Sequence, residues 1–391
     1  MVSLAHPTTV TPEVAVLAER VREHAARREP LRVVAGGTWL DAGRPVRAAA
    51  RLELASLAGI IEYVPGDLTI TARAGTPLAD IARETAAHGQ WLALDPIGVD
   101  GGTVGATIAT ASVGPLATAF GGPRDQVLGL EFITGEGEVA RGGGRVVKNV
   151  AGFDLVRLLT GAWGTLGIIT EVTLRLRARP ARDVTFVAPI ATDPAALRAL
   201  GTALRALPFT PYAFEIVDAA FVARLGVGAR PVAIIRLGGS DAVLQAQRDA
   251  MVHALGGALR GSMEESDVSL WDRLRASEPA QAAVARFSAP PGDFAATWDE
   301  ASYVAARVPG SFVSGSPHRG VVRVAMPGDE ATLRPALGGR RASATCTRVY
   351  ERLPAALWPK LAPSAVADRL SRGLREKFDP SGVLNPGILG D

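Results

Sequence analysis

The sequence predicts an α+β protein made of two domains and a C-terminal segment. Its 391 residues allow two or three domains at about 100–200 residues each. Strand and helix patterns alternate along the chain, and no heptad pattern of a coiled coil is present. The glycines are unevenly spread, with 17 of 43 between Gly98 and Gly167, and the pattern changes after Pro180. We therefore divide the chain at 1–180, 181–350 and 351–391.

The first part begins with an amphipathic helix and a strand that ends in a glycine loop. Thr11 and Pro12 mark the start of the helix. Alternating apolar residues on either side of Pro65-Gly66-Asp67 predict a β-hairpin, and Gly89 ends the next helix. The predicted elements are helix 12–25, strand 31–35, strands 60–64 and 68–74, helix 77–88, strand 126–134, helix 154–160 and strand 168–176.

The second part has the pattern of a mainly antiparallel sheet with helices on one face. The predicted strands are 184–188, 214–217, 232–237, one at Val313, 321–325 and 348–352. The predicted helices are 194–207, 240–255, 269–276 and 294–304. A last helix, 364–378, leads into the C-terminal turn 379–387.

Composition excludes several functional classes. The 42 basic and 39 acidic side chains give a net charge of +3 that is spread along the chain, which argues against nucleic-acid binding. The single cysteine, Cys346, allows no internal disulfide and no iron–sulfur cluster held by this chain alone, and it indicates a cytoplasmic setting. The first ten residues lack a signal-peptide pattern and no apolar run is long enough to span a membrane, so we expect membrane contact only through a partner.

Three glycine clusters beside predicted strands indicate an anion-binding site. They are Gly36-Gly37-Thr38, Gly101-Gly102-Thr103-Val104-Gly105 and Gly161-x-x-Gly164-x-x-Gly167. A single Gly-Gly pair is typical of an ordinary turn, but three clusters together allow backbone N–H groups to converge on a pyrophosphate. The G-x-G-x-x-G fingerprint between strand and helix and the G-x-x-x-x-G-K-[ST] loop are both missing, which argues against a nicotinamide Rossmann domain and a P-loop NTPase.

In these clusters the chain resembles the FAD-binding domain of the vanillyl-alcohol-oxidase, or PCMH-type, flavoprotein superfamily. The similar segments are 35–38, 101–106, 120–129 and 161–170, with 378–387 at the C-terminus. Lys148-Asn149-Val150-Ala151-Gly152-Phe153-Asp154 is similar to the smaller flavin-binding subunit of the bacterial glycolate oxidase complex. The resemblance implies an FAD-binding domain of two α+β subdomains and a cap domain with an antiparallel sheet covered by helices.

The resemblance also implies that the glycine loops hold FAD. The implied cofactor-binding residues are Ala35, Gly36, Gly37, Thr38, Trp39, Gly101, Gly102, Thr103, Val104, Gly105, Ala109, Ser112, Gly114, Gly121, Arg124, Asp125, Lys148, Asn149, Gly152, Gly167, Ile168, Ile169, Thr170 and Asn385. The first two loops would face the pyrophosphate, and 168–170 the adenosine half. Lys148 would place a positive charge near N1 and C2=O of the flavin, unless it is a surface cation or pairs with Asp154. Covalent attachment is not expected, because the first loop has no histidine and Cys346 is expected to lie far away in the cap.

No catalytic base is assigned, and no metal site is expected. The larger catalytic relatives carry an H-x-G-D-G-N-x-H pattern, whereas His318 has neither a second histidine nor an acidic neighbour in its loop. Cap arginines are candidates for binding a substrate carboxylate through two hydrogen bonds, although such arginines are more often solvated or at a subunit contact. These arginines are Arg319, Arg323, Arg340 and Arg341.

Three functions follow from the resemblance. The first is an FAD-dependent subunit that oxidises glycolate or a related D-2-hydroxy acid to the 2-oxo acid by hydride transfer to flavin N5. Its implied partners are a larger, metal-bearing flavoprotein subunit and an iron–sulfur subunit. The second is a non-catalytic electron-relay or structural subunit of the same complex, and the third is a stand-alone FAD-dependent dehydrogenase. A nicotinamide-binding protein is a distant fourth alternative.

Overall fold

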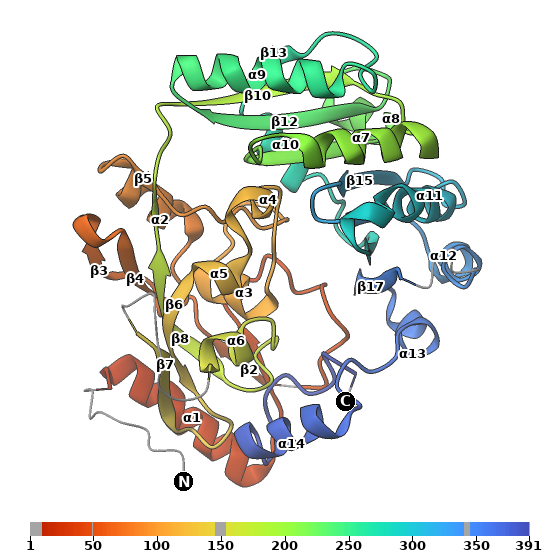
Figure 1. Ribbon diagram of the computed structural model, residues 1–391. Helices are drawn as coiled ribbons and strands as arrows, with labels where there is room; N and C mark the ends of the chain where they lie inside the picture. The colour runs from red at the N-terminus through yellow and green to blue at the C-terminus, as the bar shows by residue number, and fades with distance from the viewer. Residues whose placement is uncertain (1–9, 49, 145–153, 340–344, 391) are drawn as a thin grey trace.

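The structure is a computed structural model that describes residues 10–48, 50–144, 154–339 and 345–390. It has two main parts: an N-terminal part that contains the glycine loops and a cap built on a large antiparallel sheet (Figure 1). The C-terminal segment leaves the cap and returns to the N-terminal part. Among the described residues, no helix is both long and apolar enough to cross a bilayer.

The N-terminal part is built on a five-stranded antiparallel sheet with the order β3-β4-β8-β6-β7. Strands β1 and β2 form a separate parallel pair in which Leu31 lies opposite Ala50. Strands β5 and β9 form a short antiparallel pair. The strands are β1 Leu31–Val34, β2 Ala50–Glu53, β3 Ile60–Val64, β4 Thr69–Arg73, β5 Gln90–Trp91, β6 Val127–Ile133, β7 Val139–Gly143, β8 Ile168–Arg175 and β9 Arg177–Ala178. The helices are α1 Pro12–Arg27, α2 Leu78–Ala86, α3 Val104–Thr110, α4 Ala117–Phe120, α5 Pro123–Gln126 and α6 Leu155–Leu159.

Two apolar clusters divide this part into two subdomains. Helix α1 buries Val14, Leu17 and Val21 on one face, and these pack with Leu31 of β1 and Leu52 of β2. Spacings of three and four residues place such side chains on one side of a helix, which explains why α1 covers the parallel pair. The second cluster joins the five-stranded sheet to α3 and α6. The glycine loops lie where the two subdomains meet.

The cap is built on one eight-stranded antiparallel sheet with the order β13-β10-β12-β11-β15-β16-β14-β17. Its largest apolar cluster lies between the sheet and helices α7, α9, α11 and α12. The strands are β10 Arg182–Pro189, β11 Ala213–Val217, β12 Val232–Gly239, β13 Glu264–Ser266, β14 Ala283–Ser288, β15 Phe312–Ser316, β16 Val321–Met326 and β17 Thr347–Arg352. The helices are α7 Pro194–Ala206, α8 Ala219–Leu225, α9 Asp241–Leu255, α10 Leu270–Arg275, α11 Phe294–Ala305 and α12 Glu330–Leu337.

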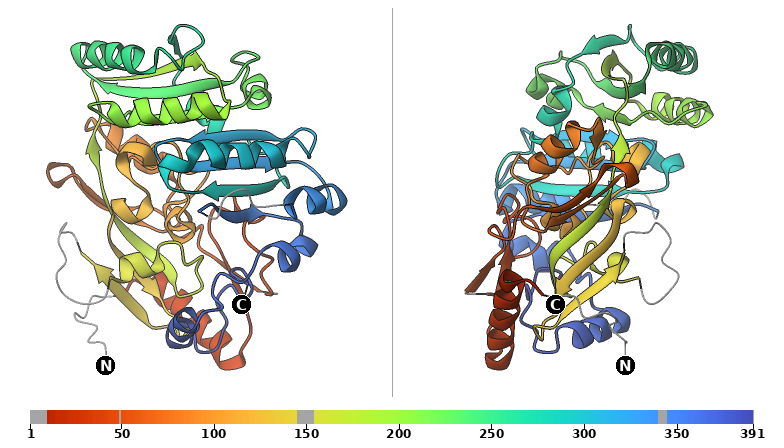
Figure 2. Two further views of the ribbon diagram at one scale, coloured as in Figure 1. Left: turned by 45° about the vertical axis from the view of Figure 1, so that its right-hand side comes forward. Right: turned by 90° about the vertical axis from the view of Figure 1, so that its left-hand side faces the viewer.

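The C-terminal segment contains α13 Trp358–Leu361 and α14 Arg369–Phe378. All three ribbon views place α14 at the end of the molecule that holds α1, opposite α9 (Figures 1 and 2). The segment then pairs with β1: the Leu31 N–H donates to Val383 O at 2.7 Å, and the Asn385 N–H donates to Leu31 O at 2.9 Å. The chain end therefore completes the wall behind the first glycine loop.

The predicted start of the last helix is wrong. We predicted a helix from residue 364, but α14 begins at Arg369 because the Asp368 side chain accepts the Ser371 N–H at 3.0 Å and caps it there. Upstream of this cap, the Ala365 N–H donates to Leu389 O at 2.9 Å, which holds residues 363–367 against the C-terminal turn.

Candidate flavin and active site

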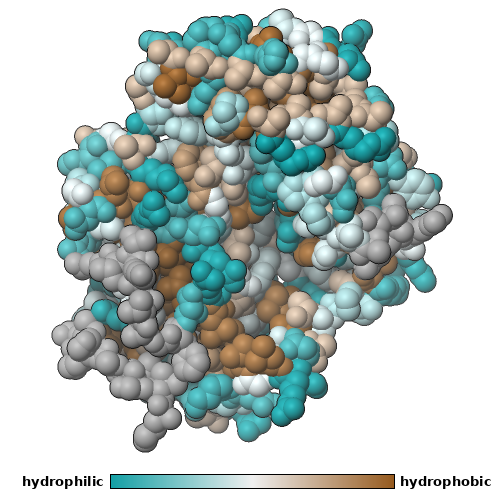
Figure 3. Space-filling view, in the orientation of Figure 1, coloured by the Kyte–Doolittle hydropathy of each residue, from teal (hydrophilic) through white to brown (hydrophobic). Residues whose placement is uncertain are grey.

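A branched cleft runs between the glycine loops and the cap. Its largest chamber, about 760 Å³, lies between Trp39, Trp163 and cap strands β14, β16 and β17. A chamber of about 240 Å³ is lined by α2 and residues 94–103, and one of about 130 Å³ lies under the end of β1. Trp39 lines all three chambers, so they meet at the first glycine loop. In the space-filling view the surface is hollowed between the two parts (Figure 3).

The first glycine loop presents unused backbone amides to this cleft. β1 ends at Val34, and Gly37 takes a left-handed conformation with φ 71°, which a side chain would disfavour. Within the described residues, the N–H groups of Gly36, Gly37 and Thr38 donate to no protein acceptor. Gly36 backs directly onto the second loop: a Cβ on Gly36 would stand 2.6 Å from Gly101 O. The two loops therefore approach more closely than any side chain allows.

In the second glycine loop, the residues at the start of α3 offer a ligand a hydroxyl group rather than free backbone amides. The Val104 N–H donates to Thr76 O at 2.9 Å and the Gly105 N–H donates to Ala74 O at 2.8 Å, so neither amide is available to a ligand. By contrast, Thr103 Oγ1 is buried and has no hydrogen-bond partner among the described residues. Gly102 lines the second chamber, and no protein atom lies within 4 Å of the position that its Cβ would take.

Ser112 continues this polar surface beyond α3. Its Oγ is buried without a hydrogen-bond partner among the described residues, and the residue lines the two larger chambers. Unpaired buried hydroxyls are costly, so Thr103 and Ser112 are groups that a bound ligand would satisfy.

The third glycine cluster forms the opposite wall. Trp163 has φ 54°, and its carbonyl accepts the Asn385 Nδ2–H at 2.8 Å while Asn385 Oδ1 accepts the Val33 N–H at 2.8 Å. Asn385 therefore links the first strand, the third cluster and the chain end. The Trp163 ring stacks on Trp39, with 6.1 Å between ring centroids and 13° between planes. Gly167, Ile168 and Asn385 line the smallest of these three chambers.

Most of the sequence-predicted cofactor residues line the cleft. Those that do are Ala35, Gly37, Thr38, Trp39, Gly101, Gly102, Thr103, Gly105, Ala109, Ser112, Gly167, Ile168, Ile169 and Asn385. Gly36 is part of the first loop but backs onto the second, and Gly114 lines a small neighbouring cavity below the cap. Val104 and Thr170 are buried behind the wall, where Thr170 Oγ1 donates to Glu131 Oε1 at 2.8 Å.

Three predicted residues are not brought to the cleft. Gly121, Arg124 and Asp125 line none of its chambers and belong to the turn at α5, where Asp125 Oδ2 accepts the Gly122 N–H at 2.8 Å. This hydrogen bond gives the segment a local structural role. Lys148, Asn149, Gly152, Arg340 and Arg341 lie outside the described residues. Asp154 caps α6 and pairs with Arg157 at 2.7 Å.

Cys346 lies much nearer the site than the sequence analysis supposed. The expectation that it lies far away is wrong, because this buried thiol lines the same large chamber as Trp39. His318, by contrast, packs its ring against Phe214, and burial lowers the pKa of its imidazole. Among the described residues, no three His, Cys, Asp or Glu side chains are grouped closely enough to hold a metal ion.

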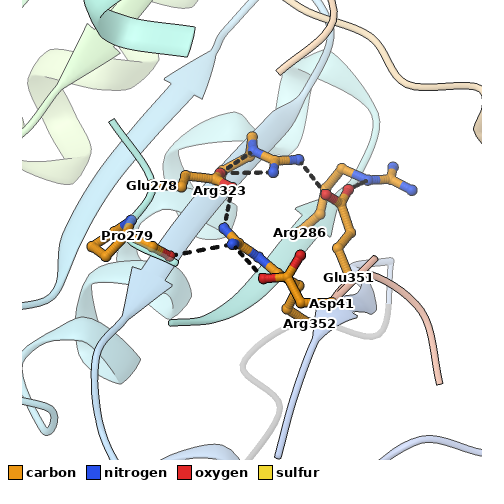
Figure 4. A network of polar contacts seen from close by, with 7 residues as sticks. All are labelled: Asp41, Glu278, Pro279, Arg286, Arg323, Glu351 and Arg352. Carbon is orange, nitrogen blue, oxygen red and sulfur yellow. Dashed lines mark hydrogen bonds and ion pairs between the residues drawn. The ribbon is translucent and has the colours of Figure 1, made fainter. Parts of the chain in front are cut away.

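A network of ion pairs, here called the roof, lies between the cap and the first glycine loop, and the sequence did not predict most of it (Figure 4). Arg286, Arg323 and Glu351 line the largest chamber, and Asp41, Glu278 and Arg352 line a neighbouring chamber of about 350 Å³. Arg323 Nη2 donates to Glu278 Oε1 at 2.7 Å, and Arg323 Nη1 lies 2.8 Å from Glu351 Oε2. Arg286 Nε donates to Glu351 Oε1 at 3.0 Å. Arg352 Nη2 donates to Glu278 Oε2 at 2.8 Å. The roof therefore pairs each of its three arginines with a carboxylate.

The roof also contacts the first glycine loop. Arg352 Nη1 donates to Asp41 Oδ2 at 3.1 Å, and Asp41 lies three residues after Thr38 in the chain. The Gly43 N–H donates to Glu351 O at 2.8 Å. These two hydrogen bonds connect the cap to the segment that follows the first glycine loop.

A second group of charges bridges the two parts near the cleft. Burial raises the pKa of Asp95 to about 7, although the Leu116 N–H and nearby Arg275 oppose the shift. Burial also raises the pKa of Glu215, on β11, to about 7; Arg319 opposes this shift, and Asp95 adds to it. Burial lowers the pKa of Arg319, and its Nη1 donates to Gly114 O at 3.2 Å. Two carboxyl groups near this interface thus prefer to keep a proton close to neutral pH.

These carboxyl groups predict a pH-dependent stability. In an unfolded chain both release their protons near pH 4, whereas in the folded protein they keep them to about pH 7. The free energy of unfolding should therefore fall as pH rises from about 4 to 7 and then level off. We expect Glu215→Gln to make this decline less steep, which melting temperatures measured between pH 5 and pH 8 would show. The control is E136Q, on an exposed turn, whose melting temperature should change with pH as that of the wild type does. A decline in E215Q as steep as in the wild type would contradict the assignment.

Comparison with known proteins agrees with this arrangement. Residues 10–143 match the family described as "FAD binding domain". The chain is 35% identical to glycolate oxidase subunit GlcE of Escherichia coli over 228 residues, which is 58% of this chain and 64% of that protein. It is 31% identical to glycolate oxidase subunit GlcD of Bacillus subtilis over 209 residues, 53% of this chain and 44% of that protein. The matched regions thus span less than two thirds of each relative.

Solved structures share the whole fold at low sequence identity. p-Cresol methylhydroxylase with bound substrate superposes with a TM-score of 0.73 at 15% identity, covering 96% of this chain and 87% of that one. 4-Ethylphenol oxidase from Gulosibacter chungangensis gives 0.71 at 16% identity with the same coverage. The prediction of a PCMH-type fold with a cap domain is therefore confirmed.

Proposed function

We propose that this chain, an FAD-binding oxidoreductase of the PCMH-type fold, is the FAD-bearing subunit of a glycolate oxidase type complex that oxidises glycolate or a related D-2-hydroxy acid to the 2-oxo acid. The observation that carries the proposal is the close approach of two glycine loops, with unpaired amides on one and the unpaired Thr103 hydroxyl on the other. The similarity to two glycolate oxidase subunits supports the substrate class.

The residues present fit FAD. The amides of Gly36, Gly37 and Thr38 can donate to an anionic pyrophosphate, as successive backbone N–H groups do in anion-binding nests. The buried hydroxyls of Thr103 and Ser112 have no hydrogen-bond partner in the described protein, and bound FAD would supply one for each. The branched cleft gives room for an elongated dinucleotide that passes Trp39. When bound, FAD would accept the two electrons of the oxidation, and the chain positions it and sets its surroundings.

The proposed complex includes a larger, metal-bearing flavoprotein subunit and an iron–sulfur subunit that takes electrons onward. The 391 residues contain one cysteine, so a cluster ligated by several thiolates would need other chains. We further propose a cytoplasmic location, with any membrane association made through these partners.

A second candidate function is favoured by the roof of the cleft. Arg286, Arg323 and Arg352 are each paired with a carboxylate of the protein, so none is left to bind a substrate carboxylate. This pairing favours an FAD-bearing electron-relay or structural subunit whose flavin does not react with glycolate directly. The stand-alone dehydrogenase predicts instead that the isolated chain turns over without partners.

Anaerobic spectroscopy of the isolated chain separates these candidates. Glycolate should bleach the visible flavin absorbance if the chain oxidises the substrate itself. Bleaching by dithionite but not by glycolate would assign the relay or structural role. Purified protein that contains no flavin, and takes none up from solution, would overturn both. Iron and flavin content of the complex isolated from its native source tests the partners.

We also predict that the flavin is held non-covalently, although Cys346 lines the cleft. Acid precipitation of the wild-type protein should release all yellow colour into the supernatant, because the first glycine loop contains no histidine. Cys346→Ser should release the same amount. Colour that stays with the wild-type precipitate and not with C346S would show a bond to this thiol.

A further inference from the structure

We propose that Glu351 acts as an internal ligand that fills a two-arginine binding site for a small carboxylate. The site is formed by Arg286 and Arg323 and opens onto the largest chamber of the cleft. The inference rests on the proposed function only in treating this chamber as a ligand site. The ligands of this site are small mono- and dicarboxylates, and the native protein holds the site closed with its own Glu351 side chain.

The register of the cap sheet brings two positive charges together. Arg286 on β14 and Arg323 on β16 are directly paired across neighbouring antiparallel strands. Like charges in this position repel each other, so the pair requires an anion between them. Glu351 supplies that anion: its Oε1 accepts from Arg286 Nε at 3.0 Å, and its Oε2 lies 2.8 Å from Arg323 Nη1. Each carboxylate oxygen thus faces a different arginine, as the oxygens of a bound carboxylate would (Figure 4).

Both arginines also have hydrogen-bond partners other than Glu351. Arg323 Nε and Nη2 both donate to Glu278 Oε1, at 3.0 and 2.7 Å. Arg286 Nη1 donates to Ser288 Oγ at 3.1 Å. Removing the Glu351 side chain would therefore leave two guanidinium groups already oriented toward the same point. Such preorganisation lowers the ordering cost of binding a ligand.

The charges of the roof balance only while Glu351 is present. Arg286, Arg323 and Arg352 carry three positive charges, and Glu278, Glu351 and Asp41 carry three negative ones, so the roof is neutral. Burial alone would raise the pKa of Glu351, but Arg323 and then Arg286 outweigh burial and hold that pKa below its ordinary value. The Glu351 side chain is thus an anion at neutral pH, and its loss leaves one positive charge facing the chamber.

The native chain should therefore bind small carboxylates weakly, because they must compete with a tethered carboxylate. Glu351→Ala should open the site. Trp39 and Trp163 line the same chamber, so their fluorescence can report binding. We would titrate the full chain with acetate, glycolate and oxalate, using chloride at matched ionic strength and neutral glycolamide as controls. The expected result is at least tenfold tighter carboxylate binding by E351A than by the wild type.

The matched control is Asp183→Ala, in the same cap sheet. It frees Arg236, whose Nε and Nη2 donate to Asp183 at 2.9 and 2.6 Å, but neither residue lines the largest chamber. D183A should therefore bind carboxylates no better than the wild type in this assay. An equal gain in D183A and E351A, or no gain in E351A, would overturn the proposal.

The proposal can also be tested if E351A does not fold without a ligand. If E351A unfolds in plain buffer, acetate or glycolate should restore its melting transition where chloride does not, and failure of every carboxylate to do so would overturn the proposal. These measurements need no flavin reduction. A chain whose flavin never reacts with glycolate can thus still confirm the site, and a catalytically active chain can still refute it.

Discussion

Gly36→Ala should lose most of its affinity for FAD while both parts of the protein stay folded. A Cβ at this position would stand 2.6 Å from Gly101 O and 3.2 Å from Thr103 Cγ2. A backbone oxygen cannot rotate away as the end of a flexible side chain can, so the two glycine loops must separate. The amides of the first loop and the hydroxyl of Thr103 would then no longer converge. Overpacking of this kind costs about 1–3 kcal/mol, equivalent to roughly 5- to 150-fold in the dissociation constant.

The measurement is FAD titration of the flavin-free protein, together with the flavin content after purification. Gly66→Ala is the matched control: no protein atom lies within 4 Å of its added Cβ, and it lies in the hairpin turn away from the cleft. Gly102→Ala adds a methyl group that also meets no protein atom but enters the second chamber. It should fold normally and bind FAD more weakly than G66A. Wild-type affinity in G36A would refute the proposed role of the loop contact.

The parts of this structure that the sequence predicts are those with short-range signals. The hairpin of β3 and β4 follows from alternation around a Pro-Gly-Asp turn, and α1 follows from its cap and its apolar spacing. The first glycine loop is visible because Gly36 and Gly37 come directly after an apolar strand. Each of these signals lies within about a dozen residues, where local conformational preference and side-chain burial agree.

Other features depend on residues that are distant in the chain. Arg352 pairs with both Asp41 and Glu278 over the cleft, and no spacing rule relates these three positions. The stack of Trp39 on Trp163 likewise forms only when the subdomains meet. Strand β14 was missed because Ala283 and Ala285 carry little strand preference and the strand is fixed by pairing on both sides with β16 and β17. The local turn in which Asp125 Oδ2 accepts the Gly122 N–H was also not predicted, and the cofactor contact at Gly121 and Asp125 stays a prediction.

Arg323→Met should destabilise the cap more than any other single substitution in this roof. The guanidinium contacts both Glu278 and Glu351, and the Arg323 and Glu278 side chains are only 14% and 11% exposed. Methionine keeps much of the volume but leaves the two carboxylates with one arginine each. Breaking a buried charge pair by removing one partner costs about 3–5 kcal/mol. We expect the midpoint of urea unfolding to fall accordingly.

The control for this loss is an exposed ion pair between the same sheet and helix α9. Arg182 on β10 pairs with Asp241 at 2.6 Å, but the two side chains are 52% and 80% exposed. R182M should change stability by no more than about 1 kcal/mol. A similar small change in R323M would show that the roof is not a buried charge network in solution.

The pH dependence of R323M distinguishes lost charge compensation from lost packing. In the wild type, Arg323 and Arg286 hold the pKa of Glu351 below its ordinary value. The ion pairs between Glu351 and these arginines therefore stabilise the fold, and this stabilisation is lost as pH falls through the lowered pKa. Without Arg323, burial has less opposition and the pKa of Glu351 should rise. A buried carboxyl with a raised pKa gains stability by keeping its proton as pH falls. The stability difference between R323M and the wild type should therefore narrow from pH 8 to pH 5, whereas a packing defect alone would leave it constant.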